Sequence, residues 1–141
     1  MKVIGFNFTK IDAEKIKENS EGLKLKIGTS IDISQIKEVK FKILKTKEHI
    51  LGIDFSFNVK YEPDMAKVSL LGKLLVSLEP KLAKEVLNQW KDKKMPEDFK
   101  FFLFNVILKK STLKALYIEE DLNLPLHMPM PSFKKENKES N

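Results

Sequence analysis

The sequence contains no cysteine and no arginine, because all 26 of its basic residues are lysine. The absence of cysteine excludes disulfide bonds, thiolate nucleophiles, iron–sulfur clusters and cysteine-based zinc sites. The absence of arginine removes the planar donor that recognises guanine edges, phosphates and carboxylates bidentately, since lysine acts as a hydrated point charge. Small secreted scaffolds held by disulfides are therefore not expected.

Long apolar runs are also missing from the sequence. A membrane-spanning helix needs about eighteen apolar residues in succession, and no such stretch occurs. The first residues, MKVIGFN, contain no uninterrupted apolar stretch long enough for a signal peptide. We therefore expect a cytoplasmic protein without membrane insertion.

Signatures of enzymes are absent as well. The five glycines, at positions 5, 22, 28, 52 and 72, never form a phosphate-cradling loop. His49 and His127 lie far apart and have no metal-ligand neighbour at helical spacing. The acidic run Glu119–Asp121 follows a predicted helix and is expected to be a solvated loop rather than an acid–base pair. The sequence therefore predicts a protein that is not an enzyme and that holds no metal or cofactor.

The length of 141 residues predicts one domain, and the content of 42% apolar and 33% charged residues is typical of a chain that folds in water. We expect a single domain over residues 1–133. Residues 134–141 are polar and are expected to form a disordered tail.

The net charge of +6 raises the alternative of a basic nucleic-acid-binding module. Base stacking on a sheet would need exposed aromatic side chains, and Phe41, Phe55 and Phe57 lie in predicted strands. Each of them shares its phase with aliphatic residues, which favours a place in the core. Much of the lysine alternates with apolar residues and therefore predicts the solvated face of a sheet.

The first half of the chain has the period of two that is typical of strands. A short first strand contains Ile4, Phe6 and Phe8, and residues 12–22 predict a crossover loop or short helix. Three further segments alternate, namely Leu23 to Ile33, Val39 to Ile43 and Leu51 to Tyr61. A last strand, from about Ala66 to Leu78, has apolar residues on both faces, so a second layer or a second subunit must cover it.

The period then changes to that of a helix. A short helix begins at Glu79-Pro80, with proline at its first position, and a long helix begins near Met95-Pro96 and runs to about Tyr117. Eight of the ten residues from Phe99 to Leu108 are apolar. A helix that is apolar on every side must be covered on every side. We therefore expect a homo-oligomer that covers Phe101, Phe102 and Phe104.

The segment from Leu122 to Phe133 contains three prolines and two methionines among its apolar residues. Proline excludes a helix interior and a central strand, so the segment is expected to be extended. Methionine is flexible and polarisable. The segment therefore predicts either the cap of a core or a surface that adapts to varied apolar partners.

Four parts of the sequence carry a family resemblance: the opening Phe6-Asn7-Phe8-Thr9-Lys10-Ile11, the alternating Leu23-Lys24-Leu25-Lys26-Ile27, the pair Leu82-Ala83, and the proline-rich residues 122–133. In this order they resemble the SecB export-chaperone family. The resemblance implies an α+β fold, in which a four-stranded antiparallel sheet carries two C-terminal helices on one face. It also implies a dimer of dimers with the long helices between the sheets, and ATP-independent holding of unfolded or pre-export polypeptides.

The resemblance further implies where such clients and other subunits would bind. The implied client groove contains apolar residues of the long helix together with Leu23, Leu25, Ile27, Leu124, Leu126, Met128 and Met130. The strand that would join dimers contains Val68, Leu70 and Leu74. For each of these residues, a plain core or subunit contact is the alternative. The basic charge departs from the acidic bacterial members, so a handover to the SecA motor is not expected. A general holdase and a chaperone dedicated to one antitoxin or client both stay open.

Overall fold

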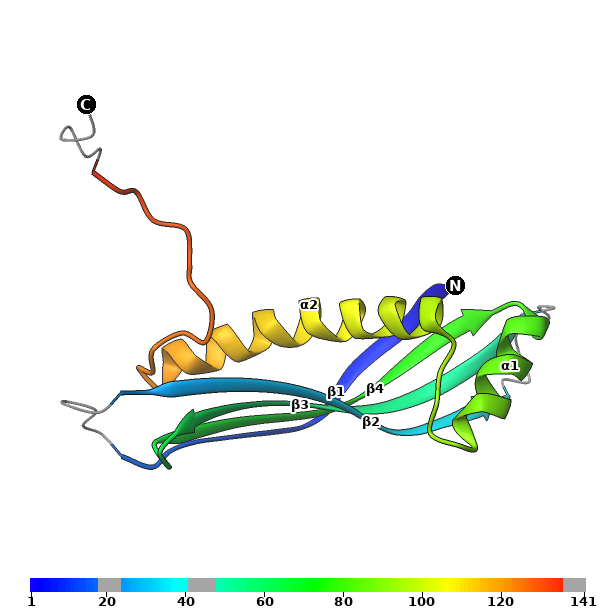
Figure 1. The fold of residues 1–141 in the computed structure, drawn as a ribbon, viewed down its shortest axis with the longest axis horizontal. Coiled ribbons are helices and arrows are strands. Elements are labelled where there is room, and N and C mark those ends of the chain that lie inside the picture. Colours follow the sequence, from blue (N-terminus) through cyan, green and yellow to red (C-terminus); the bar gives the residue numbers. More distant parts are fainter. Residues whose placement is uncertain (18–23, 41–47, 136–141) are drawn as a thin grey trace.

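The computed structural model describes residues 1–17, 24–40 and 48–135, which contain four strands and two helices (Figure 1). The strands are β1 (Lys2–Lys15), β2 (Lys26–Val39), β3 (His49–Glu62) and β4 (Ala66–Leu78), and they form one antiparallel sheet in the order β1-β4-β3-β2. Two helices follow, α1 (Pro80–Trp90) and α2 (Glu97–Asp121). The predicted α+β class, with a four-stranded antiparallel sheet and two C-terminal helices, is confirmed.

Alternation along β3 and β4 builds the core. Their inward apolar residues are at most 4% exposed, and Leu51, Phe57 and Leu70 are fully buried. Phe55 lies opposite Gly72, where a Cβ would be 2.4 Å from the Phe55 ring and 2.7 Å from the carbonyl oxygen of Asn7. Gly72 therefore leaves the space that the ring of Phe55 fills.

The edge strands contain irregularities that move their apolar residues between faces. β1 has register shifts between Val3 and Gly5 and between Phe8 and Lys10, so Ile4 is 42% exposed instead of joining Phe6 in the core. The strand also continues to Lys15, through part of the predicted crossover.

A single strand, β2, contains most of the second predicted strand and also Val39, where the third was predicted to begin. β2 runs on to Val39, with a register shift between Ile33 and Gln35 that brings Ile36 into the core. A one-residue bulge reverses the phase of the residues that follow it, which explains the apparent break in the sequence. The remaining residues predicted for the third strand, Phe41 and Ile43, lie outside the described residues.

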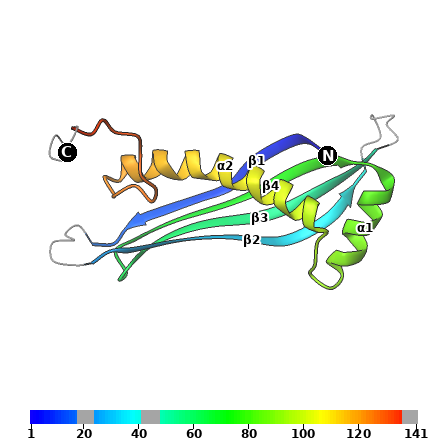
Figure 2. The same cartoon turned by 45° about the horizontal axis from the view of Figure 1, so that its top comes forward.

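The long helix α2 covers the face of the sheet that carries the core, and it runs along the length of the strands (Figure 2). It begins where it was predicted, with Pro96 before its first turn, and ends at Asp121 rather than near Tyr117. Every fourth residue is buried, beginning with Phe99, Leu103 and Ile107. The short helix α1 packs Ala83 and Val86 against β2 and β3 at one end of the sheet.

The predicted division of β4 into two faces is confirmed, but three of its residues need a new assignment. Val68, Leu70 and Leu74 are at most 1% exposed, because they face the helices of their own chain. Their side chains therefore have no surface left for a second subunit, which corrects their assignment to an interface. On the opposite face of β4, Leu71 is 39% exposed.

Candidate functional site

The outer face of α2 is apolar and exposed. Phe101, Leu108, Leu113 and Tyr117 are 58%, 44%, 64% and 72% exposed. These side chains point away from the residues that pack on the sheet. The prediction that one subunit leaves part of this helix uncovered is confirmed.

The chain reverses direction at the end of α2, runs back beside the helix for a short distance and then leaves the body of the molecule (Figure 1). Asn123 adopts a left-handed conformation, with φ at 53°, and the amide N–H groups of Asn123 and Leu124 donate to the carbonyls of Glu120 and Glu119. This is a Schellman cap in which asparagine occupies the position usually taken by glycine. Leu124 then enters the core, where it is 6% exposed. We call residues 122–135 the C-terminal strap.

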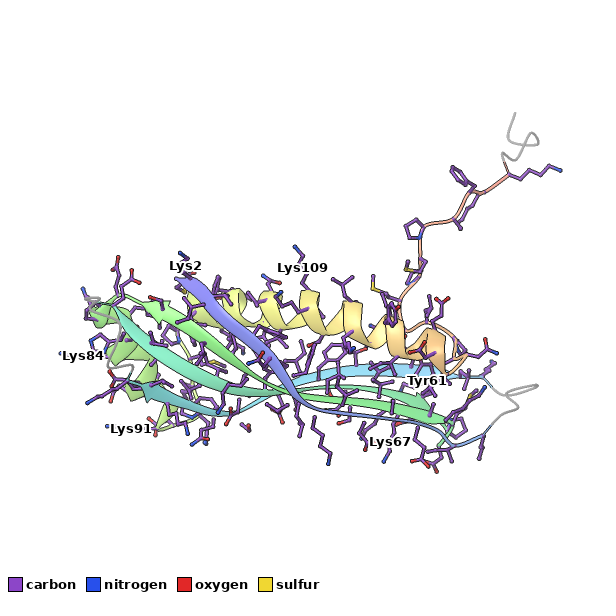
Figure 3. The ribbon with its side chains drawn as sticks, turned by 180° about the vertical axis from the view of Figure 1, so that it is seen from behind. Lys2, Tyr61, Lys67, Lys84, Lys91 and Lys109 are labelled. Atoms are coloured by element: carbon purple, nitrogen blue, oxygen red, sulfur yellow. The ribbon has the colours of Figure 1, made fainter. Side chains whose placement is uncertain are left out.

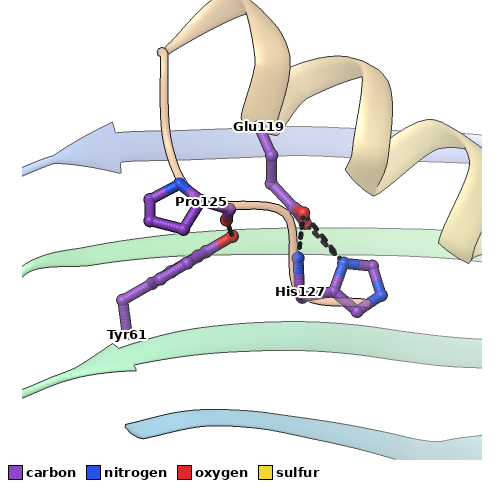
Figure 4. Close-up of polar contacts among 4 residues, drawn as sticks. All are labelled: Tyr61, Glu119, Pro125 and His127. Atoms are coloured by element: carbon purple, nitrogen blue, oxygen red, sulfur yellow. Dashed lines mark hydrogen bonds and ion pairs between the residues drawn. The ribbon is translucent and has the colours of Figure 1, made fainter. Parts of the chain in front are cut away.

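A buried carboxylate holds the C-terminal strap against α2 (Figure 4). Glu119 is completely buried, and its Oε1 accepts a hydrogen bond of 2.8 Å from the backbone N–H of His127. The Nδ1 of His127 lies 2.9 Å from Oε1 and 2.7 Å from Oε2. A carboxylate can only accept, so Nδ1 carries the proton of this contact. Glu119 therefore lies buried on the helix in a hydrogen-bonded contact with His127, which corrects the expectation of a solvated loop.

Tyr61 on β3 gives the strap a second attachment. Its hydroxyl donates to the carbonyl oxygen of Pro125 at 2.5 Å. Burial raises the pKa of Tyr61 far above its usual 10, and the charge and hydrogen bonding of Glu119 raise it further. The phenol therefore stays protonated and remains a donor.

A groove lies between α2, β2 and the strap. Its volume is about 920 Å³. One wall comes from residues 127–131 of the strap, and Thr29 of β2 lies at the border. The other wall consists of six residues of α2, namely Asn105, Leu108, Lys109, Thr112, Leu113 and Leu116.

Two smaller hollows continue this apolar surface around α2. One, of about 390 Å³, lies between the helix and the strap and includes Leu126, Glu120 and Met130. The other, of about 480 Å³, lies between α2 and β1, where Phe6 and Phe8 form the floor. Leu113 lines all three spaces. The exposed half of α2 is therefore surrounded by apolar hollows.

The charge around these hollows differs in sign, because Glu120 and Asp121 border the hollow between α2 and the strap, whereas lysines border the other two. Lys109 borders the large groove and projects from the side of α2 away from the sheet (Figure 3). Lys110 and Lys114 border the hollow beside β1, and neither has an acidic partner within 4.0 Å in the part of the chain that the structure describes. An apolar segment with acidic neighbours would complement this surface.

Two features, a metal-binding cluster and a membrane-spanning helix, are absent from the described ranges. Residues 1–17, 24–40 and 48–135 contain no group of three or more histidine, aspartate or glutamate residues arranged to hold a metal. Within the same ranges, neither helix has the length and apolar character to cross a membrane.

The structure brings together only part of the client groove implied by the sequence. Met128 and Met130 line the large groove, and Leu126 lines the hollow beside it. Leu124 belongs to the core, and Leu25 and Ile27 are half-buried against the same cluster instead of lining the groove. Leu23 lies outside the described residues.

The resemblance implied that apolar residues of the long helix belong to the groove but did not say which ones, and sequence reasoning missed the Glu119–His127 contact. The apolar pattern of α2 has no single phase, so it did not indicate which residues face outward. A histidine within an apolar segment, eight residues after a glutamate, was the available signal for the buried pair.

Two of the three aromatic residues considered for base stacking belong to the core. Phe55 is 2% exposed and Phe57 is fully buried. Phe41 lies outside the described residues. The predicted core position of Phe55 and Phe57 is confirmed, and neither can stack on a base.

No family model matches the chain, and no curated protein matches it. Among solved structures, the chain is similar to the SecB-like chaperone Rv1957 of Mycobacterium tuberculosis, solved in complex with a ChAD peptide from the Rv1956 HigA1 antitoxin. The two chains are 10% identical, the match covers 96% of this chain and 92% of that chain, and the TM-score is 0.47. This neighbour is structurally distant, so the function proposed below rests on the groove itself.

Proposed function

We propose that the protein is an ATP-independent chaperone, a holdase, that binds extended segments of unfolded polypeptide in the groove between α2, β2 and the C-terminal strap. The observation that carries this proposal is the open, largely apolar groove of about 920 Å³ beside an uncovered apolar helix face. Among the described residues that line the groove, Lys109 and His127 are the ionisable ones. Such a surface favours apolar contact over recognition of charge.

Unfolded polypeptides present the matching chemistry. They expose apolar side chains, and covering these removes apolar surface from water. They also have unpaired backbone groups, and β2 is an edge strand of the described sheet, so its outer backbone groups can pair with an extended segment. Methionine side chains at the strap adapt to partners of different shape. The site therefore suits many sequences, each bound weakly.

We propose further that the protein acts as a homo-oligomer, a dimer of dimers. Phe101 is 58% exposed and lies in the first half of α2, outside the groove lining. Phe104 is half-buried, and Phe102 packs mainly against the core. Phe101 and Phe104 are therefore the better candidates for subunit contact. Several grooves on one oligomer would raise the avidity for a long unfolded chain.

The clients that we propose are unfolded chains with acidic residues near apolar ones. The net charge of +6 and the lysines that border two of the hollows around α2 favour such segments, and this preference should weaken as salt increases. The proposal includes pre-export polypeptides and a single dedicated client. It includes no catalysis, no cofactor, no nucleic-acid partner and no handover to the SecA motor.

Suppression of aggregation tests the proposed function. The purified protein, at a substoichiometric amount of oligomer and without ATP, should suppress aggregation of a chemically unfolded model protein on dilution. The double variant Leu126→Asp/Met128→Asp should suppress it less while its mass in solution stays unchanged, because both residues line apolar hollows. Leu71→Asp, on the opposite face of the sheet, is the matched control. No suppression at a several-fold molar excess would contradict the proposal, and tight, strongly salt-dependent binding to single-stranded RNA would favour the nucleic-acid alternative.

A further inference from the structure

The Glu119–His127 contact is the last polar attachment before the strap becomes a wall of the groove. His127 is followed directly by Met128, Pro129, Met130 and Pro131, which all line the groove. No hydrogen bond joins residues 128–135 to the rest of the described chain. The position of this wall therefore depends on what holds His127.

The chemistry of this attachment is unusual for an apolar cluster. Glu119 is 0% exposed and the side chain of His127 is 6% exposed, with the His127 ring edge-on to Phe57 at 6.2 Å. A buried carboxylate is costly unless it is paired and hydrogen-bonded, and here His127 of the strap supplies two donors, its backbone N–H and Nδ1, beside the hydrogen bonding between Glu119 and Tyr61. Moving His127 away would leave Glu119 without these donors. The arrangement in which His127 contacts Glu119 is therefore strongly favoured over one in which His127 has moved away.

We propose that Glu119 and His127 form a latch that fixes the strap as a wall of the groove, and that they are thus positioning residues for polypeptide binding. The proposal rests on the proposed function of the groove. The strap does not fill the groove, since about 920 Å³ stays open with the strap in place. Releasing the latch should therefore weaken binding rather than free a blocked site.

A second histidine–glutamate pair in the same chain provides a matched control. His49 Nδ1 lies 2.8 Å from Glu38 Oε1, at the end of β2 and the start of β3, and the two side chains are 35% and 34% exposed. This pair has the same chemistry but lies outside the groove lining. An exposed pair of this kind contributes little to stability.

The test compares His127→Phe and Glu119→Gln with His49→Phe and Glu38→Gln in the full-length chain. His127→Phe keeps an aromatic ring beside Phe57 but loses the Nδ1 donor, and it changes the strap without changing α2. Because the chain has no native cysteine, spin labels can be attached only at two introduced cysteines, Ser132→Cys and Lys84→Cys. The two labels in one molecule report the distance from the strap to α1. A short fluorescent peptide of alternating leucine and aspartate is the binding probe.

Both latch variants should broaden the distance distribution and weaken peptide binding about tenfold or more, as when one partner of a buried charge pair is removed. The two control variants should change neither measurement. If Glu119→Gln unfolds the protein, His127→Phe alone decides the result.

Three results would overturn the latch. They are an unchanged distance distribution, an unchanged peptide affinity despite a mobile strap, or tighter binding, which would make the strap a competitor of the client. Failure of the latch with intact binding by the unaltered protein would leave the proposed function standing. Absence of peptide binding by the unaltered protein would contradict both.

Discussion

Shortening the two methionines of the groove gives a direct measure of how much the strap contributes to binding. Met128 is 42% exposed and Met130 is 56% exposed, so together they present about one whole methionine residue to solvent. Covering a full methionine side chain contributes about 1.5–3 kcal/mol. Alanine keeps the β-carbon, so we expect Met128→Ala/Met130→Ala to lose about 1–2 kcal/mol of binding free energy, which is about a 5- to 30-fold rise in Kd.

Fluorescence anisotropy of a labelled, reduced and carboxymethylated protein, which cannot refold, would measure this Kd. The fold should be preserved, because substitutions of exposed side chains usually change the free energy of unfolding by less than about 0.5 kcal/mol. Leu71→Ala is the control, since Leu71 is 39% exposed on the other face of the sheet. Equal affinities of the double variant and the unaltered protein, or an equal loss in Leu71→Ala, would refute the assignment of the groove.

Three further predictions concern the fold and the assembly. Gly72→Ala should lower the free energy of unfolding by about 2–4 kcal/mol in chemical denaturation, because the added methyl group meets the Phe55 ring and a backbone carbonyl, and an unchanged midpoint would contradict this. The pKa of Tyr61 is raised in the folded state. The protonated phenol therefore contributes its full stabilisation of the folded state below pH 10, and this contribution decreases as pH rises above 10. Tyr61→Phe should therefore show a flatter loss of stability in alkali and should lack the last phenolate absorbance step, and an unaltered titration would be inconsistent with a buried phenol. Phe101→Asp should reduce the mass measured by light scattering while the fully exposed Phe133→Asp should not, and a monomeric unaltered protein would refute the assembly.

The sheet and both helix starts followed from local signals in the sequence. Alternation over Leu51 to Tyr61 and the prolines at positions 80 and 96 are short-range features, and each fixes its element without knowledge of the rest of the chain. The bulges in β1 and β2 were not predictable in this way. A single inserted residue changes the face of Ile4 and Ile36 but leaves no mark in composition.

The site was harder to predict because it depends on which groups meet in space. Glu119 is buried since Asn123 turns the chain back and brings His127 to its carboxylate. The groove wall on α2 depends on the rotation of a helix whose apolar residues surround it. By contrast, the surface position of Met128 and Met130 followed from the sequence, because the prolines beside them exclude regular structure, and both residues line the groove.

Cross-linking from defined positions tests most directly whether unfolded polypeptide lies in this groove. A photoreactive benzoylphenylalanine would replace Leu108 on the groove wall, or Leu71 on the opposite face of the sheet, in otherwise identical protein. On illumination with a reduced, unfolded protein and no ATP, we expect attachment from position 108 and little from position 71, and no attachment from either to the same protein in its folded form. Equal attachment from both positions, or attachment from position 71 alone, would contradict the central claim.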